Sequence, residues 1–91
     1  MKNELELNKV LTDIKDPKIM MDFLKDITTP KEFETLQQRL NVVCLLHKEL
    51  SYSEISKITK ASTTTITRVA RFFKDEKYGG YRWVIKNILK K

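Results

Sequence analysis

Residues 51–74 read SYSEISKITKASTTTITRVARFFK, and this stretch decides the fold. Ser51 and Glu54 have the spacing of a capping box, in which the serine hydroxyl and the glutamate carboxylate each accept a free backbone N–H of the other residue. A helix of about two turns is therefore predicted to begin here. Its apolar residues Ile55 and Ile58 are expected to face inward.

A tight turn is expected next, at Lys60 and Ala61, after which Ser62 can cap a second helix. Lys60 stands where a left-handed backbone usually requires glycine, a departure that costs about 1 kcal/mol. The core-facing residues of the second helix are spaced as one helical face, and they are Ile66, Val69, Ala70 and Phe73. The opposite face carries hydroxyl and guanidinium groups and no acid. Its members are Thr63, Thr64, Thr67, Arg68 and Arg71.

A short helix, a tight turn and a second helix with such a face are the parts of a helix-turn-helix unit, whose second helix enters the major groove of DNA. Threonine can form hydrogen bonds with base edges and offers a methyl group to thymine, and arginine can bind guanine or a phosphate through two parallel hydrogen bonds. Ordinary surface helices also carry threonines and arginines. Because the caps, core spacing, face chemistry and regional charge agree, we expect DNA binding.

Charge is distributed unevenly along the 91 residues, whose net charge is +6. Residues 1–36 hold 6 Lys and 8 acidic residues, a net charge of −2, whereas residues 37–91 hold 12 Lys or Arg and 4 acidic residues, a net charge of +8. A basic second half is expected of a chain that meets a polyanion there. Basic faces also occur on other soluble proteins and on surfaces that meet anionic lipid.

The composition predicts a single all-α domain, residues 1–91. It includes 41% hydrophobic residues but only 2 Gly and 2 Pro, too few turn residues for a sandwich or barrel of short strands. One cysteine, Cys44, and one histidine, His47, exclude an internal disulfide and a structural zinc site, and neither is accompanied by a catalytic partner. We therefore expect no metal and no enzymatic activity.

The sequence has neither a membrane-spanning run nor a signal-like start. A cytoplasmic protein associated with the nucleoid is therefore expected.

Three helices are expected in the first half of the chain. Apolar residues recur at helical spacing over 7–14 and over 17–27, where Asp16 is an N-cap followed by proline at the first helical position. A capping box at Thr29 and Glu32 begins the third and longest helix.

The apolar face of this third helix is wide. Its members are Phe33, Leu36, Leu40, Val43, Leu46 and His47, widened by Val42 and Leu45. Two short amphipathic helices provide little surface to cover it, and a chain of this size is marginally stable alone. Residues 1–50 are therefore predicted to be dimerisation helices that pack against a second copy.

Gly79 and Gly80 break the helical pattern after residue 74. A C-terminal packing helix is expected over residues 81–91, with Lys90 and Lys91 at its negative dipole end. The apolar face of this helix consists of Tyr81, Val84, Ile85, Ile88 and Leu89.

Several short motifs resemble a known family. They are TP at 29–30, QRL at 38–40, LSYSEI at 50–55, TITRV at 65–69 and YGGYR at 78–82. In these motifs the chain resembles the Trp repressor superfamily, and more closely its YerC/YecD-type branch. The resemblance implies a six-helix chain that forms an intertwined homodimer with a C-terminal helix-turn-helix. It also implies a bacterial transcriptional regulator that acts as a repressor. Its two helix-turn-helix units would reach successive major grooves of a palindromic operator, about 34–36 Å apart.

The resemblance assigns DNA contacts to both helices of the helix-turn-helix. The implied base contacts are Thr63, Thr64 and Thr67. The implied phosphate contacts are Ser53, Ser56 and Lys57. Their positive charge adds Lys60 and Arg71 to the expected DNA contacts. Arg68 and Arg71 are expected to anchor the protein on the DNA. Phosphate contacts position the protein, and base contacts supply its sequence preference.

The Trp repressor holds tryptophan between two arginines, which Arg39 and Arg68 match, and Thr29 matches a third pocket position. Val69 and Phe72, however, stand where the repressor has a glycine and a serine, and both add bulk where the ligand would lie. We expect these side chains to fill the pocket, so that neither tryptophan nor another small effector is required. In the alternative interpretation, Arg39 pairs with Glu34, Glu49 or an acid of a second copy, and Arg68 binds phosphate.

Two classes of function are compatible with these features. The first is a sequence-specific regulator that binds double-stranded DNA as a homodimer. The alternative is a helical dimeric module that binds a protein partner through its basic face. Steep salt dependence of DNA binding would favour the first, and stoichiometric binding to a protein without retention on DNA would favour the second.

Overall fold

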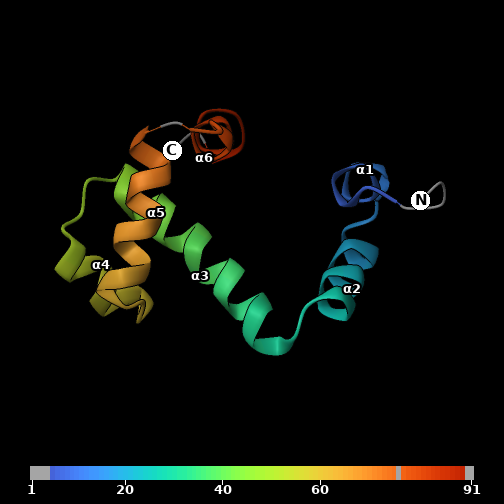
Figure 1. Cartoon of the computed structure of the whole chain (residues 1–91), viewed down its shortest axis with the longest axis horizontal. Helices are drawn as coiled ribbons and strands as arrows, with labels where there is room; N and C mark the ends of the chain where they lie inside the picture. Colours follow the sequence, from blue (N-terminus) through green and yellow to red (C-terminus); the bar gives the residue numbers. More distant parts are fainter. Residues whose placement is uncertain (1–4, 76, 90–91) are drawn as a thin grey trace. The chain divides into compact units, whose positions relative to one another are not determined.

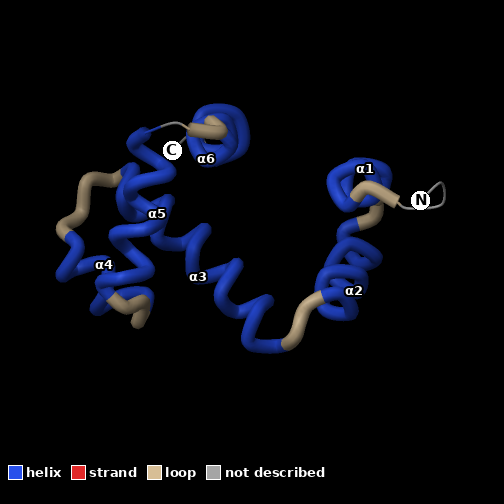
Figure 2. The backbone as a smooth tube through the Cα atoms, viewed as in Figure 1, coloured by secondary structure: helices blue, strands red, loops and turns tan. Residues whose placement is uncertain are grey.

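The structure, a computed structural model, describes residues 5–75 and 77–89. All regular secondary structure in these residues is helical, which confirms the predicted all-α class (Figure 1). The helices are α1 (Leu7–Asp13), α2 (Pro17–Ile27), α3 (Pro30–His47), α4 (Tyr52–Thr59), α5 (Thr63–Asp75) and α6 (Gly80–Val84), followed by a π-helical segment, Ile85–Leu89. Loops and turns join the helices (Figure 2). Lys90 and Lys91, expected at the end of the last helix, lie outside the described residues.

The chain divides into two compact units, Met1–Glu34 and Thr35–Lys91. Within the part that the structure describes, no helix is long and apolar enough to cross a membrane.

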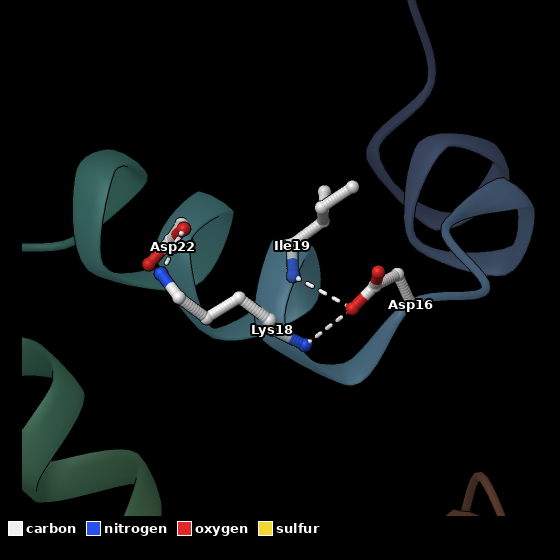
Figure 3. Close-up of polar contacts among 4 residues, drawn as sticks. All are labelled: Asp16, Lys18, Ile19 and Asp22. Carbon is white, nitrogen blue, oxygen red and sulfur yellow. Dashed lines mark hydrogen bonds and ion pairs between the residues drawn. The ribbon is translucent and has the colours of Figure 1, made fainter.

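The N-terminus of α2 is fixed by the predicted cap. Oδ1 of Asp16 accepts the backbone N–H of Lys18 at 2.8 Å and that of Ile19 at 3.4 Å (Figure 3). Pro17 occupies the first turn, where its missing N–H is not needed. Lys18 also forms an ion pair with Asp22, one turn further along, at 2.8 Å. These contacts are local in sequence, which explains why the start of α2 is predictable.

Both ends of α3 are held by hydrogen bonds. At its start, Thr29 Oγ1 accepts the Glu32 N–H at 3.1 Å and Glu32 Oε1 accepts the Thr29 N–H at 2.8 Å, which confirms the predicted capping box. At its end, Glu49 adopts a left-handed conformation with φ +65°. The Leu50 N–H then donates to Leu45 O at 3.3 Å. This is a Schellman motif with glutamate where glycine is usual.

The core of the second unit is apolar, and no polar or charged residue described is buried in it. It is assembled from the C-terminal half of α3, from α4 and the turn after it, from α5 and from the π-helical segment. The buried residues are Val42, Val43, Leu46, Ile55, Ala61, Ile66, Val69, Ala70, Phe73 and Ile85. The predicted inner face of α5 is thereby confirmed in full.

The inner face of α4 differs from the prediction. Ile55 is fully buried, but Ile58 is 61% exposed, so its predicted inward position was wrong. An eight-residue helix makes only a narrow contact, and the half-buried residues beside Ile55 are Ser56 and Thr59. The hydroxyls of these residues donate to backbone carbonyls at 2.8 Å each, those of Ala61 and Ile55 respectively. Ile58 is left outside this contact.

The C-terminal helix also differs from the prediction. A single regular helix was expected, but the chain changes at Ile85 from an α-helix to a π-helix. A π-helix has more residues per turn than an α-helix, so a residue three positions further on lies further from the face of the first residue. Ile85 is accordingly buried and Leu89 packs against the core, whereas Ile88, predicted on the same face, is 63% exposed. Trp83 on α6 is 60% exposed.

Apolar side chains remain uncovered on the first three helices. No described residue of α1 or α2 is buried, and Leu7, Ile19 and Ile27 are more than half exposed. On α3, Leu36 and Leu40 are exposed, although the same stripe is buried further along the helix. Within the second unit, the predicted wide apolar face of α3 is therefore covered only in its C-terminal half.

Candidate nucleic-acid interface

The first helix of the candidate interface begins at a reciprocal cap. Ser51 Oγ accepts the Glu54 N–H at 3.1 Å, and Glu54 Oε1 accepts the Ser51 N–H at 2.9 Å, which confirms the predicted capping box. The hydrogen bond from the Ser51 backbone, with a further contribution from its hydroxyl, lowers the pKa of Glu54 below its ordinary value. The glutamate is therefore ionised at neutral pH, where it caps α4 most effectively.

The turn between α4 and α5 is short and internally bonded. Lys60 adopts the left-handed conformation expected at this position, with φ +66° and ψ 11°, and its N–H donates to Ser56 O at 2.8 Å. The Ala61 N–H donates to Thr59 Oγ1 at 3.1 Å. Ala61 itself is buried in the core. These bonds fix the direction in which the chain enters α5.

The outer face of α5 follows from its buried face. Ser62 Oγ accepts the Thr65 N–H at 3.1 Å, which caps the helix as predicted. Since the apolar side is anchored in the core, the opposite side is turned to solvent. An open hollow of about 440 Å³ lies on it, lined by Thr63, Thr64, Thr67, Arg68 and Arg71. The first turn of α5 contains no acidic residue. The structure thus brings five predicted contact residues onto one cationic, hydroxyl-rich surface.

The other four predicted DNA-contact residues do not line this hollow. Ser53 and Lys57 are exposed on α4, and Lys60 is exposed in the turn. Ser56 is half-buried, and its hydroxyl donates to Ala61 O at 2.8 Å. Its side chain is therefore engaged within the turn.

A second hollow, of about 470 Å³, lies on the other side of Arg68. Its lining residues are Arg39, Leu40, Arg68, Val69, Phe72, Tyr78, Gly80, Tyr81 and Val84. Val69 and Phe72 contribute to its wall, and the hollow is open beside them. Arg39 Nε is buried and has no hydrogen-bond partner in the described residues. Thr29, the third residue assigned to the pocket by resemblance, uses its hydroxyl to cap α3.

Arg68 is part of an aromatic stack that the sequence analysis did not predict. Its Cζ lies 5.1 Å from the centroid of the Phe72 ring. Phe72 in turn stacks with Tyr78, with ring centroids 6.2 Å apart and planes 16° apart. The spacing of four residues between Arg68 and Phe72 could have indicated the first contact. Tyr78 follows the end of α5, and no periodicity marks its position.

The C-terminal end of α5 is joined to α6. Arg82 Nε donates to Phe73 O at 3.0 Å, and its Cζ lies 4.8 Å from the Phe73 ring centroid. Gly79 precedes α6 with φ +76°, a conformation that favours glycine. Within residues 5–75 and 77–89, no group of three or more His, Cys, Asp or Glu side chains could hold a metal ion.

Comparisons with known proteins agree with the resemblance predicted from the motifs. Residues 3–89 match the family described as Trp repressor protein. The chain is also similar to the uncharacterized protein YerC of Bacillus subtilis (strain 168), with 39% identity over 64 residues. These residues represent 70% of this chain and 61% of the relative, so less than two thirds of the relative's length is matched.

Proposed function

Because the chain belongs to the Trp repressor protein family, we propose that it is a sequence-specific regulator of transcription that binds double-stranded DNA. The observation that carries the proposal is the acid-free hollow on the outer face of α5. The major groove of DNA is wide enough to admit one α-helix, and a helix anchored in a core on its other side can enter it without deformation.

The proposed roles follow the chemistry of each side chain. Three threonines, Thr63, Thr64 and Thr67, contact base edges. Four cations, Lys57, Lys60, Arg68 and Arg71, contact phosphates together with Ser53. Ser56 serves DNA binding indirectly, since its hydroxyl bonds to the carbonyl of the turn.

The functional form in this proposal is a homodimer on a palindromic operator. The uncovered apolar side chains of α1, α2 and the first half of α3 supply the contact surface for a second copy. Two recognition helices would then meet successive major grooves about 34–36 Å apart. In a bacterial cell, such a protein would be found in the cytoplasm on the nucleoid.

The proposed regulator binds DNA without tryptophan or another small effector. The contact of the Arg68 guanidinium with Phe72 supports this part of the proposal, since a ligand held between Arg39 and Arg68 would compete with that ring. Added tryptophan should therefore leave DNA affinity unchanged. An increase in affinity with tryptophan would contradict it.

The proposal is tested by selecting bound sequences from a random duplex pool at moderate salt and measuring the affinity for the enriched site. An enriched palindrome is expected. If a dimer neutralises about eight phosphates, log affinity should fall with log salt at a slope near −7. Arg71→Ala should make this slope shallower by about two units per dimer. Lys25→Ala, which removes a cation from the acidic N-terminal segment, is the matched control and should not alter it.

Absence of both enrichment and salt dependence would refute DNA binding. Stoichiometric capture of a protein in the same conditions would support the alternative, an interaction module that uses the basic face.

A further inference from the structure

Arg68 has an unusual position between the two hollows. Among the described residues, it alone lines both the hollow on the outer face of α5 and the cavity bordered by Arg39 and Phe72. Its side chain is exposed, so no burial restricts it. Its guanidinium contacts the Phe72 ring, with Cζ 5.1 Å from the ring centroid.

The ring that contacts Arg68 is itself supported. Phe72 lies one turn further along α5, and its ring stacks on Tyr78 with planes 16° apart. The ammonium of Lys77 lies 5.5 Å from the other member of the stack, the Tyr78 ring. Tyr78 belongs to the segment between α5 and α6. Residues from two parts of the chain therefore hold the aromatic surface on which the guanidinium lies.

Such a stack leaves the binding capacity of arginine intact. A cation–π contact uses the attraction between the charge and the ring face, and it consumes no N–H donor. All five guanidinium donors remain available for a phosphate. A free arginine loses rotamer freedom when it binds, and a side chain restricted beforehand loses less.

We propose that Phe72 and Tyr78 are positioning residues that hold the Arg68 guanidinium at the edge of the outer hollow, ready to bind a DNA phosphate. This inference rests on the proposed function and deepens it. The chain itself supplies the surface that orients the arginine, so orientation does not depend on a bound molecule.

The first test measures affinity for the selected duplex. Phe72→Leu and Tyr78→Leu should each weaken binding by about two- to five-fold per protomer, the range of an exposed cation–π contact. Phe72→Tyr retains a ring and should bind like the wild type. Tyr78 is 82% exposed, so the effect of Tyr78→Leu cannot arise from loss of the core. On an Arg68→Ala background, Phe72→Leu should cause no further loss, because the residue that it positions is absent.

The second test observes Arg68 in the free protein by NMR. Ring-current shifts of its side-chain signals should be present in the wild type and in Phe72→Tyr, and should disappear in Phe72→Leu. Unchanged shifts in Phe72→Leu, or an equal loss of affinity with and without Arg68, would overturn the positioning role. A wild type that binds no duplex would overturn the proposed function together with this role. A wild type that binds DNA and is indifferent to Phe72→Leu would overturn the positioning role alone.

Discussion

Glu49 and Lys60 both adopt left-handed backbone conformations without being glycine, with φ of +65° and +66°. They lie on either side of α4, one in the turn that precedes it and one in the turn that follows it. A side chain in this conformation costs about 1 kcal/mol relative to glycine, because its Cβ approaches the backbone closely. The turns at both ends of α4 therefore form despite the conformational cost of a left-handed non-glycine residue in each.

Replacing Lys60 with glycine should raise the free energy of unfolding by about 1 kcal/mol, since the penalty is removed while the backbone hydrogen bonds of the turn remain. Urea denaturation measures the change. Lys57→Gly is the matched control, because the same substitution inside α4 should lower stability by about 1 kcal/mol. A Lys60→Gly protein less stable than the wild type would contradict the left-handed backbone conformation of residue 60 in the folded protein.

Glu54 gives the stability a predictable dependence on acid. Its pKa is lowered in the folded state by the hydrogen bond from the Ser51 backbone. A carboxyl with a depressed folded pKa stabilises the fold above its unfolded pKa, and this stabilisation is lost as the pH falls through the folded value. The stability difference between the wild type and Glu54→Gln should therefore shrink as the pH falls below about 4.3. Denaturant midpoints measured across this range test it, and a constant difference would rule out this role of the carboxylate.

At the scale of elements, α4 contains two isoleucines with opposite surroundings. Ile55 is fully buried, and Ile58 is mostly exposed. Ile55→Ala should lower the free energy of unfolding by about 2–5 kcal/mol, because it removes buried methyl groups and leaves a cavity. Ile58→Ala deletes the same atoms from a solvent-exposed site and should change stability by less than about 0.5 kcal/mol. Equal effects of the two substitutions in chemical denaturation would contradict the observed orientation of α4.

Helix boundaries were largely predictable, since the groups that set them lie close together in sequence. The caps of Asp16, Thr29 and Ser51 each act on backbone groups within three residues, and all were identified from spacing alone. The outer face of α5 could be predicted for a related reason. Once its apolar residues are assigned to the core, the position of the other side chains on the helix is determined.

Features that depend on packing between separate elements were not predictable. The exposure of Ile58 depends on how α4 lies on its neighbours, and the π-helical segment changes the face that a regular helix would have presented. The stack of Arg68, Phe72 and Tyr78 requires a segment beyond α5 to fold back beside it. Periodicity reports which residues share a face but does not report what covers that face.

At the scale of the whole molecule, the apolar residues left uncovered on α1–α3 predict that stability depends on protein concentration. Association with a second copy stabilises the folded state by mass action, so the melting temperature should rise with concentration. Leu36→Glu should abolish this dependence and yield a monomer in sedimentation equilibrium. Ile58→Glu also places a charge at an exposed isoleucine, but outside these helices, and should leave association intact. A concentration-independent melting temperature for the wild type would argue against the dimer.

Trp83, exposed on α6, is the only tryptophan of the chain. Indole fluorescence responds to the polarity of its surroundings, so the emission of the intact protein is a signal from one known location. A solvent-exposed indole emits at longer wavelength and is open to collisional quenching by iodide. Any partner that covers α6 should shift the emission to the blue and shield it, which gives the native protein an intrinsic optical probe without an added label.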